Sequence, residues 1–209
     1  MQTSSHLILG WCVGEAAGLS TPRLRRIVAL AGVAPDLDTV PYLAAYVWFG
    51  FDRQLAFTRI HQVHHHRYTH GVGFLVLVAV LCGLYILWRG PGRADVPTSR
   101  PPARRRAALG VGVLAGAAVL VHLFCDLIGS GYDWPLYPYW PVSDAARALS
   151  WSWELDAWPN RLLLWGLLAG SFVYARYAGH SFVESFHYRL DRRIVRILQT
   201  GSDRTGDDT

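Results

Sequence analysis

The chain has 209 residues, of which 52% are apolar and only 17% charged, less charge than the quarter that is usual for soluble domains. Its net charge is +5, and all 20 of its basic residues are arginines. The arginines cluster without an aromatic groove, which argues against nucleic-acid binding, while the clumped apolar residues indicate one membrane-embedded domain.

The first expected element is a short helix over residues 3–19, TSSHLILGWCVGEAAGL. It is too short to span a bilayer comfortably, so we expect it to pack inside a helical bundle. His6 lies in its first turn. A hydroxyl side chain is expected to cap the helix by accepting a free backbone N–H, from one of Thr3, Ser4 or Ser5.

Two apolar runs follow, 27–34 and 40–50, and the acidic block PDLD (residues 35–38) separates them. Carboxylates beside apolar segments are costly to desolvate unless a cation or hydrogen bonds compensate. On an extended or turn segment, Asp36 and Asp38 point to one side. Either they bind a cation, or the block simply caps a helix.

Five of the 9 histidines lie in residues 61–70, HQVHHHRYTH. Imidazole is the commonest side-chain metal ligand near neutral pH, because its lone pair is available without a strong base. His66 and His70 would share one face of a helix, whereas the spacing of His65 and His70 suits a turn. The alternative is a polar loop at the membrane surface.

Residues 71–88 and 107–129 are the clearest predicted membrane spans, and 161–178 is a third. The Pro/Gly/Arg-rich residues 89–106 between the first two are expected to form a flexible loop. Residues 130–160 are rich in Trp, Tyr and Pro, which favours a belt at the membrane boundary over a substrate cage. The cysteines lie singly in apolar runs and indicate core packing rather than disulfides: Cys12, Cys82 and Cys125.

Residues 180–199 predict an amphipathic helix on the cytoplasmic side, followed by a disordered tail at 200–209. Its basic residues suit an anionic leaflet surface. We expect His180 and His187 to pack rather than bind metal. The apolar face would contain Phe182, Phe186, Leu190, Ile194 and Leu198, and the basic residues are Arg189, Arg192, Arg193 and Arg196.

The arginine clusters predict the topology. The positive-inside rule places residues 89–106 in the cytoplasm, so the histidine run and Asp126 lie at the extracytoplasmic ends of their spans. The separate cluster at residues 23–26 agrees with this orientation. The sequence therefore predicts an all-α, multi-pass bundle in which His6, the histidine run and the end of the second span meet on the extracytoplasmic face.

That meeting point would be a metal centre. His122 and Asp126 form an HxxxD pair on one helix face, although such a pair alone is more often a hydrogen-bonded core pair. Together with His6, Asp36 and Asp38, the histidines offer mixed nitrogen and oxygen ligands, which suit zinc, manganese or iron better than calcium or magnesium. Such a set can hold more than one cation.

In this order, His6, PDLD, HHHRYTHG and HLFCDLIGSGYDWPLYP resemble the LexA-regulated, inner-membrane-associated hydrolase family, which is described as membrane-bound and metal-dependent. The resemblance covers roughly residues 3–142. It implies metal ligands at His6, Asp36, Asp38, His70, His122 and Asp126. Because HRYTH is one residue shorter than the family's HRxxTH block, the partner of His70 is either His65 or His66.

The family is distantly similar, in its His/Asp pattern, to the all-helical zinc-dependent phospholipases C. By analogy this implies hydrolysis of a phosphoester, here in a lipid or lipid-linked molecule at the bacterial inner membrane. Residues 1–179 would form the hydrolase domain, with zinc as the first candidate metal and manganese as the second. Asp38 would orient ligands or act as base, and Arg67 would hold a phosphate.

The alternative is a non-catalytic membrane protein that binds metal, transports ions or acts as a scaffold, because intramembrane Asp and His also mark ion pathways. A transporter needs polar residues that continue across the bilayer. The spans at residues 71–88 and 107–121 contain almost no such polar residues. That favours the enzyme.

Overall fold

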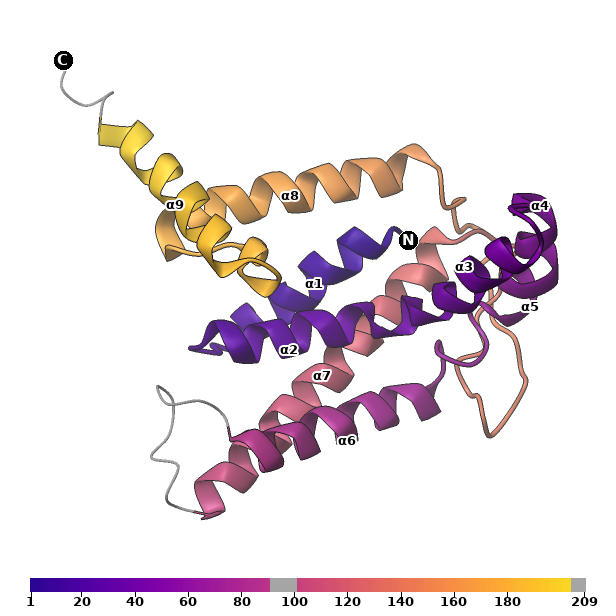
Figure 1. The fold of residues 1–209 in the computed structure, drawn as a ribbon, viewed down its shortest axis with the longest axis horizontal. Helices are drawn as coiled ribbons and strands as arrows, with labels where there is room; N and C mark the ends of the chain where they lie inside the picture. The colour runs from indigo at the N-terminus through magenta and orange to yellow at the C-terminus, as the bar shows by residue number, and fades with distance from the viewer. Residues whose placement is uncertain (91–100, 204–209) are drawn as a thin grey trace.

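The computed structural model describes residues 1–90 and 101–203 (Figure 1). Most of these residues are helical, and β-pairing among them is limited to an isolated bridge between Leu136 and Arg147, which confirms the predicted all-α class. The α-helices are α1 (Thr3–Ala16), α2 (Pro22–Val33), α3 (Thr39–Trp48), α4 (Arg53–Ala56), α5 (Gln62–His64), α6 (Val72–Arg89), α7 (Pro101–Gly129), α8 (Trp158–Ala178) and α9 (Tyr188–Asp203). Short turns connect some of them: η1 (Ala34–Asp38) and η3 (Phe182–Ser185) are 3₁₀ turns, and η2 (Phe57–His61) is a π turn.

Three helical segments of the described chain are long and apolar enough to cross a membrane: Pro22–Trp48, Val72–Arg89 and Pro102–Gly129. The last two match the spans expected at 71–88 and 107–129. However, α7 begins at Pro101, so residues 101–106 are helical rather than part of a loop. Proline is tolerated in a first helical turn because its missing N–H would have no partner there. The rest of that expected loop, residues 91–100, lies outside the described residues.

The first span was not expected as one piece, because Pro35 appeared to break it. In the structure η1 continues the path of α2 into α3, and Pro35 stands in the first turn of η1, where its missing N–H costs little. By contrast, the expected span at 161–178 forms α8 but is not among the three segments. Arg161 and Arg176 lie within it and lower its apolar character, so its crossing stays a prediction.

Both ends of the chain differ from expectation in detail. No hydroxyl caps α1: Gln2 occupies the cap position without a side-chain bond, because the helix has already begun at Thr3. At the other end, the helix expected over 180–199 divides into η3 and α9. Gly179 ends α8 in a left-handed conformation, and the side chain of Ser181 caps η3.

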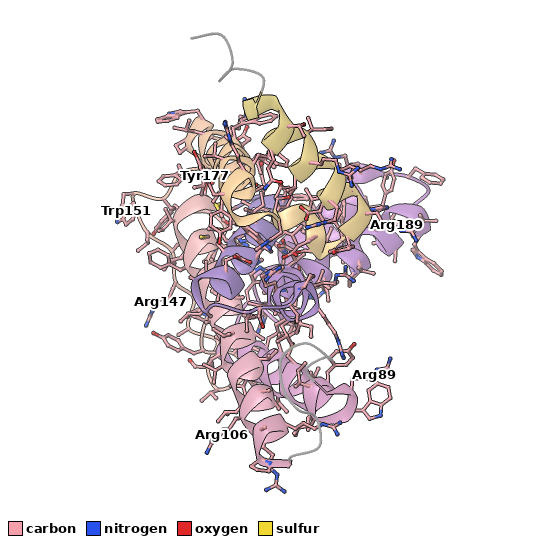
Figure 2. The ribbon with its side chains drawn as sticks, turned by 90° about the vertical axis from the view of Figure 1, so that its left-hand side faces the viewer. Arg89, Arg106, Arg147, Trp151, Tyr177 and Arg189 are labelled. Carbon is pink, nitrogen blue, oxygen red and sulfur yellow. The ribbon has the colours of Figure 1, made fainter. Side chains whose placement is uncertain are left out.

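The division of the C-terminal helix into η3 and α9 changes the role of its apolar residues. Phe182 is buried against α1 rather than exposed to a membrane, and α9 packs its own apolar side inward through Val195. The four arginines of α9 are exposed, and Figure 2 shows Arg189 pointing away from the molecule. The helix continues to Asp203, four residues beyond its expected end at 199, and residues 204–209 of the expected tail lie outside the described residues.

A close crossing of α1 and α2 positions the N-terminal histidine. A side chain at Gly32 would place its Cβ 2.9 Å from the backbone oxygen of His6, so only glycine permits this approach. The carbonyl of Gly32 also lies 2.7 Å from Nδ1 of His122 on α7. One glycine thus aligns three helices at the level of His6.

The two ends of the bundle differ in chemistry. In Figure 1 the start of α6, the end of α7 and the helices α3, α4 and α5 gather at one end. The opposite end carries the start of α2, the end of α6 and the start of α7, with their arginines, of which Arg89 and Arg106 are labelled in Figure 2. The structure therefore places the histidine run and the arginine clusters at opposite ends of the helices, as expected.

A buried charge network closes the arginine-rich end. The guanidinium of Arg25 lies 2.7 Å from Glu15 and makes a two-point contact with Glu184, one bond of which measures 2.8 Å. Burial raises the pKa of Glu15, but hydrogen bonds from His180 and Tyr174 outweigh it and lower that pKa below its usual value. The bond to Glu15 raises the pKa of His180. His180 thus belongs to an ion-pair network that ties α1, α2 and α8 to η3.

Candidate metal centre

The fold brings all eight predicted ligands to one end of the bundle. They come from four places in the chain: α1, η1, the turn after α5, and the end of α7. Five of their side chains are almost completely buried, with at most 2% exposed: His6, His66, His70, His122 and Asp126. The other three are partly buried: Asp36, Asp38 and His65. Burial of this many ionisable groups requires mutual compensation or a bound cation.

Asp126 stands at the centre of the set. Its Oδ1 lies 3.2 Å from Nε2 of His6. Its Oδ2 lies 2.9 Å from Nε2 of His122, 3.4 Å from that of His70 and 3.8 Å from that of His66. One carboxylate therefore faces four imidazoles from three segments of the chain. The α-amino group of Met1 also forms an ion pair with it.

Backbone carbonyls fix the orientation of two of these rings. Nδ1 of His122 lies 2.7 Å from the oxygen of Gly32, and Nδ1 of His66 lies 3.2 Å from that of Trp134. A carbonyl only accepts hydrogen bonds, so each Nδ1 donates its proton to that carbonyl and each ring presents its Nε2 to the interior of the site.

Two of the inward-facing ring nitrogens face each other. Nε2 of His122 lies 3.1 Å from Nε2 of His70, and both face Oδ2 of Asp126. Acceptor atoms at such distances repel unless a proton or a cation lies between them. This is the arrangement that metal-ligating histidines and carboxylates adopt.

Asp38 supports the histidines from behind. It lies 2.7 Å from Nδ1 of His65 and 3.4 Å from Nδ1 of His70, and the hydroxyl of Thr69 donates to it at 2.9 Å. A carboxylate bonded to Nδ1 holds the ring and leaves Nε2 free to ligate. The geometry agrees with the expectation that Asp38 orients ligands.

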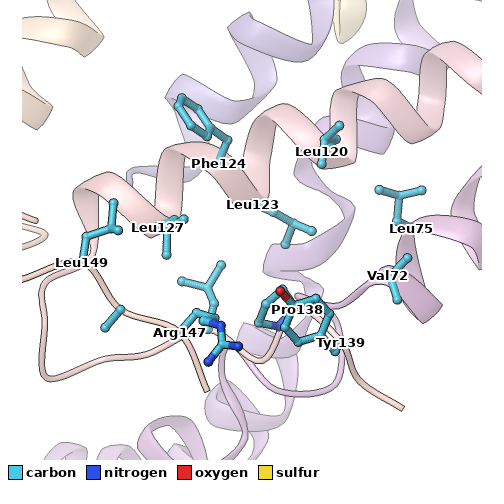
Figure 3. Close-up of a pocket in the computed structure, with 12 residues that line it drawn as sticks. Val72, Leu75, Leu120, Leu123, Phe124, Leu127, Pro138, Tyr139, Arg147 and Leu149 are labelled. Atoms are coloured by element: carbon cyan, nitrogen blue, oxygen red, sulfur yellow. The ribbon is translucent and has the colours of Figure 1, made fainter. Parts of the chain in front are cut away.

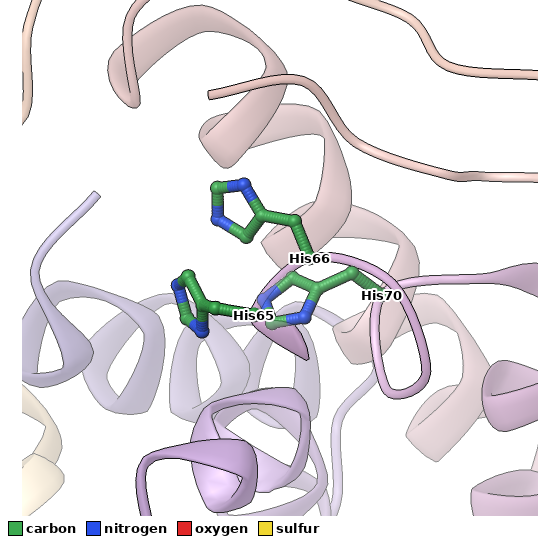
Figure 4. A group of neighbouring side chains, drawn as sticks. All are labelled: His65, His66 and His70. Carbon is green, nitrogen blue, oxygen red and sulfur yellow. The ribbon is translucent and has the colours of Figure 1, made fainter. Parts of the chain in front are cut away.

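The ligand atoms form two adjacent groups. One contains His65, His66 and His70, whose rings Figure 4 shows gathered around the turn that precedes α6. Both alternatives for the partner of His70 thus belong to this group. The other group contains His6, Asp36, His122 and Asp126. Within each group the ligand atoms lie within 4.8 Å of one another, and Asp126 contacts both groups.

These residues fit a divalent transition metal. The donor set combines several imidazole nitrogens with carboxylate oxygens, which suits zinc or manganese. Two buried polar atoms of the second group, Nδ1 of His6 and Oδ2 of Asp36, have no hydrogen-bond partner among the described residues. The presence and identity of the metal stay predictions.

Neighbouring histidines differ in protonation. Burial lowers the pKa of His66 well below its usual value, and the charge of His70 adds to this shift, so His66 is neutral near pH 7. Burial also acts on His70, but its contacts with Asp126 and Asp38 outweigh it and raise its pKa to about 9. In the protein without metal, a proton on His70 thus supplies positive charge between two carboxylates.

The turn that carries His66 is unusual. His66 adopts a left-handed backbone conformation with φ of 65°, which costs a non-glycine residue roughly 1 kcal/mol or more. The backbone oxygen of His66 accepts a hydrogen bond from the N–H of Tyr137 at 3.1 Å, so the 130–157 segment holds the turn in place. Strain of this kind is common where a side chain must be directed into a site.

The sequence analysis missed Trp134 as a part of the site. Its ring centre lies 4.8 Å from that of His65, 5.1 Å from that of His66 and 5.3 Å from that of His61. The residue had been assigned to a membrane belt with the other tryptophans. It is the first tryptophan after the HxxxD block, eight residues beyond Asp126, but only the fold shows which tryptophan returns to the histidines.

Arg67 does not join the site. Its guanidinium lies 3.0 Å from the carboxylate of Asp144 and over the ring of Tyr137, so its charge is directed toward the surface. The left-handed turn at His66 sends consecutive side chains to different sides. The expected phosphate-holding role of Arg67 is therefore not supported by its contacts.

A family model for the YdjM inner membrane protein matches residues 1–189. The chain belongs to the YdjM inner membrane protein family. The match includes all eight candidate ligands and confirms the expected inner-membrane class, in agreement with the three apolar segments. No curated protein and no solved structure matches the chain. Membership of the YdjM family thus establishes that the chain is an inner membrane protein.

Proposed function

We propose that this YdjM-family protein is a membrane-bound, metal-dependent hydrolase. Its His/Asp set would hold one or two divalent transition-metal ions, with zinc as the first candidate and manganese as the second. The substrate would be an ester, with a phosphoester of a lipid or lipid-linked molecule as the first candidate. The observation that carries the proposal is the approach of two inward-facing Nε2 atoms, from His70 and His122, to Oδ2 of Asp126 within 2.9 to 3.4 Å.

Each side chain has a distinct task in this proposal. Asp126 faces both ligand groups and would connect them, while Gly32 and Trp134 hold His122 and His66 in the ligating tautomer. Asp38 orients His65 and His70 through their Nδ1 atoms, so its role in the proposal is to position these two ligands. A zinc ion held by this set would supply Lewis acidity, which lowers the pKa of water to about 7.

The contacts favour this reading over transport. The metal centre and the Arg25 network lie toward opposite ends of α1, and a transporter would need a polar path between them. Instead α1 and α2 pack closely there: a Cβ at Gly10 would lie 3.0 Å from the backbone oxygen of Ala29. Val28 and Ala29 in this interface have no exposed surface. This dry contact leaves no room for an ion.

Metal analysis of the purified protein tests the proposal. We expect near-stoichiometric zinc or manganese, and hydrolysis of a model phosphodiester that chelation abolishes and added metal restores. His70→Ala should lose most of the metal, because it removes the ring whose Nδ1 faces Asp38 and whose Nε2 faces Asp126. His187→Ala is the matched control, since His187 only caps α9. Full metal occupancy in His70→Ala would refute the centre, and metal without any hydrolysis would favour a non-catalytic metal-binding role.

We also propose that the metal centre lies on the extracytoplasmic face of a multi-pass protein. The support is the arginine content of the opposite end of the bundle, which the positive-inside rule assigns to the cytoplasm. A reporter inserted at residues 95–100 should therefore be active only in the cytoplasm. Activity of that reporter outside the cytoplasm would overturn the orientation.

A further inference from the structure

An apolar groove of about 420 Å³ lies beside the metal centre, along another face of α7. Figure 3 shows the leucines and Phe124 of α7 on one side and Pro138, Tyr139 and Arg147 on the other. The groove is built from the same segments as the metal centre. Leu123 and Leu127 follow His122 and Asp126 directly in the chain, and Leu136 lies two residues after Trp134.

The groove has a closed floor and an open rim. Leu123 and Leu136 are 8% and 3% exposed and form the floor, whereas Leu120 and Phe124 are 59% and 61% exposed at the rim. Both α6 and α7 are candidate membrane spans, and the groove lies where α6 begins and α7 nears its end. It therefore opens toward hydrocarbon close to the membrane boundary, within reach of an acyl chain whose head group stays in the interface.

A cation stands at this groove. Arg147 is held there by its backbone, which pairs with Leu136 through bonds of 2.9 and 2.8 Å, and its guanidinium lies over the ring of Tyr139. No carboxylate among the described residues lies within ion-pair distance of it, whereas the nearby Arg67 is paired with Asp144. An exposed, uncompensated guanidinium beside an apolar groove has the chemistry to bind the anionic head of a lipid.

We propose that this groove binds an acyl chain of an anionic lipid, with Arg147 contacting its head group. Binding there would hold the ester region of the lipid beside the metal centre, so the groove would select anionic lipids as substrates. Only the selection of anionic lipids as substrates rests on the proposed hydrolase function. The lipid site itself is defined by the groove and by Arg147.

Photo-crosslinking in nanodiscs tests the site. The full chain is placed in zwitterionic nanodiscs that contain a trace of phosphatidylglycerol or phosphatidylcholine with a diazirine on its acyl chain, and labelled residues are mapped by mass spectrometry. We expect the phosphatidylglycerol probe to label residues 120–124 and 136–139 at least about fivefold more than Leu77 and Leu81, which are exposed on α6 outside the groove.

Two variants separate the contributions of charge and shape. Arg147→Gln should remove the roughly fivefold preference for phosphatidylglycerol over phosphatidylcholine, the factor expected for one interfacial arginine. Arg161→Gln, another exposed arginine at this end of the bundle, should leave the preference unchanged. Leu123→Trp should fill the floor and lower labelling of the groove by either probe. Because Arg147 is exposed, its variant tests the proposal even if Leu123→Trp does not fold.

Each possible result of the labelling experiment either supports or overturns the lipid site. Equal labelling of the groove and the exposed face of α6 would show ordinary bilayer lipid and overturn the proposal. A dimeric protein whose groove is not labelled by either probe would show that a second protomer occupies the groove, and would also overturn the proposal. Metal content is measured on the same samples. Selective labelling without bound metal would refute the hydrolase but keep the lipid site. Bound metal without selective labelling would refute the lipid site but keep the hydrolase.

Discussion

Asp126→Asn is expected to abolish metal binding while leaving the helical bundle folded. The substitution preserves the size of the side chain but removes the negative charge that faces His6, His70 and His122. Loss of a group that merely orients a ligand costs 10- to 100-fold in metal affinity. Asp126 contacts both ligand groups directly, so we expect a loss of at least about 100-fold, together with the loss of any hydrolytic activity.

Metal content after purification and dialysis measures this effect, and circular dichroism reports on folding. Asp144→Asn is the matched control, because it makes the same chemical change in a side chain that is 65% exposed and pairs with Arg67 at the surface. The control should keep its metal. If Asp126→Asn bound metal as tightly as the unaltered protein, the proposed centre would be wrong.

Arg25→Gln is expected to destabilise the protein by about 3–5 kcal/mol, the usual cost of removing one partner of a buried ion pair. The change would leave Glu184 buried without its two-point partner and would also remove the charge beside Glu15. Trp11 and His180 would keep their bonds to these carboxylates but could not replace the guanidinium. The network joins α1 and α2 to η3, so these elements should loosen together.

Thermal or denaturant unfolding in detergent measures the loss. Arg196→Gln removes an exposed arginine of α9 and should change stability by less than about 0.5 kcal/mol. Adding Glu184→Gln to Arg25→Gln should recover part of the lost stability, because the isolated buried charge is then gone. Additive losses in the double variant would contradict the role assigned to this network.

Much of the architecture was predictable from residue patterns. The spans at 71–88 and 107–129 follow from long uncharged runs, and the grouping of arginines predicted which helix ends would lie together. The errors occurred where local residue types are ambiguous. Pro35 reads as a break in a sequence but is accommodated in the first turn of η1, and the apolar spacing of residues 180–199 does not reveal that Gly179 and Ser181 form a turn there.

The sequence predicted which residues belong to the site better than it predicted the contacts between them. The spacing of His122 and Asp126, and the position of Asp36 and Asp38 between apolar runs, marked ionisable groups that needed compensation. Spacing did not choose between His65 and His66, and the structure places both beside His70, at a left-handed turn held by Tyr137. Arg67, the neighbour of both, was assigned to the site and lies outside it for the same reason.

The amino-acid sequence by itself determined that this is an apolar helical membrane protein with a set of His and Asp residues at one end, because burial and charge are properties of residue types and their order. Only the tertiary structure decided that Asp126 is the centre of that set, that Trp134 closes it, and that Arg147 stands at a lipid-sized groove beside it. Such contacts join residues far apart in the chain, such as His6 and Asp126, which are 120 positions apart. They depend on the crossing of α1 and α2 at Gly32, which no local pattern specifies.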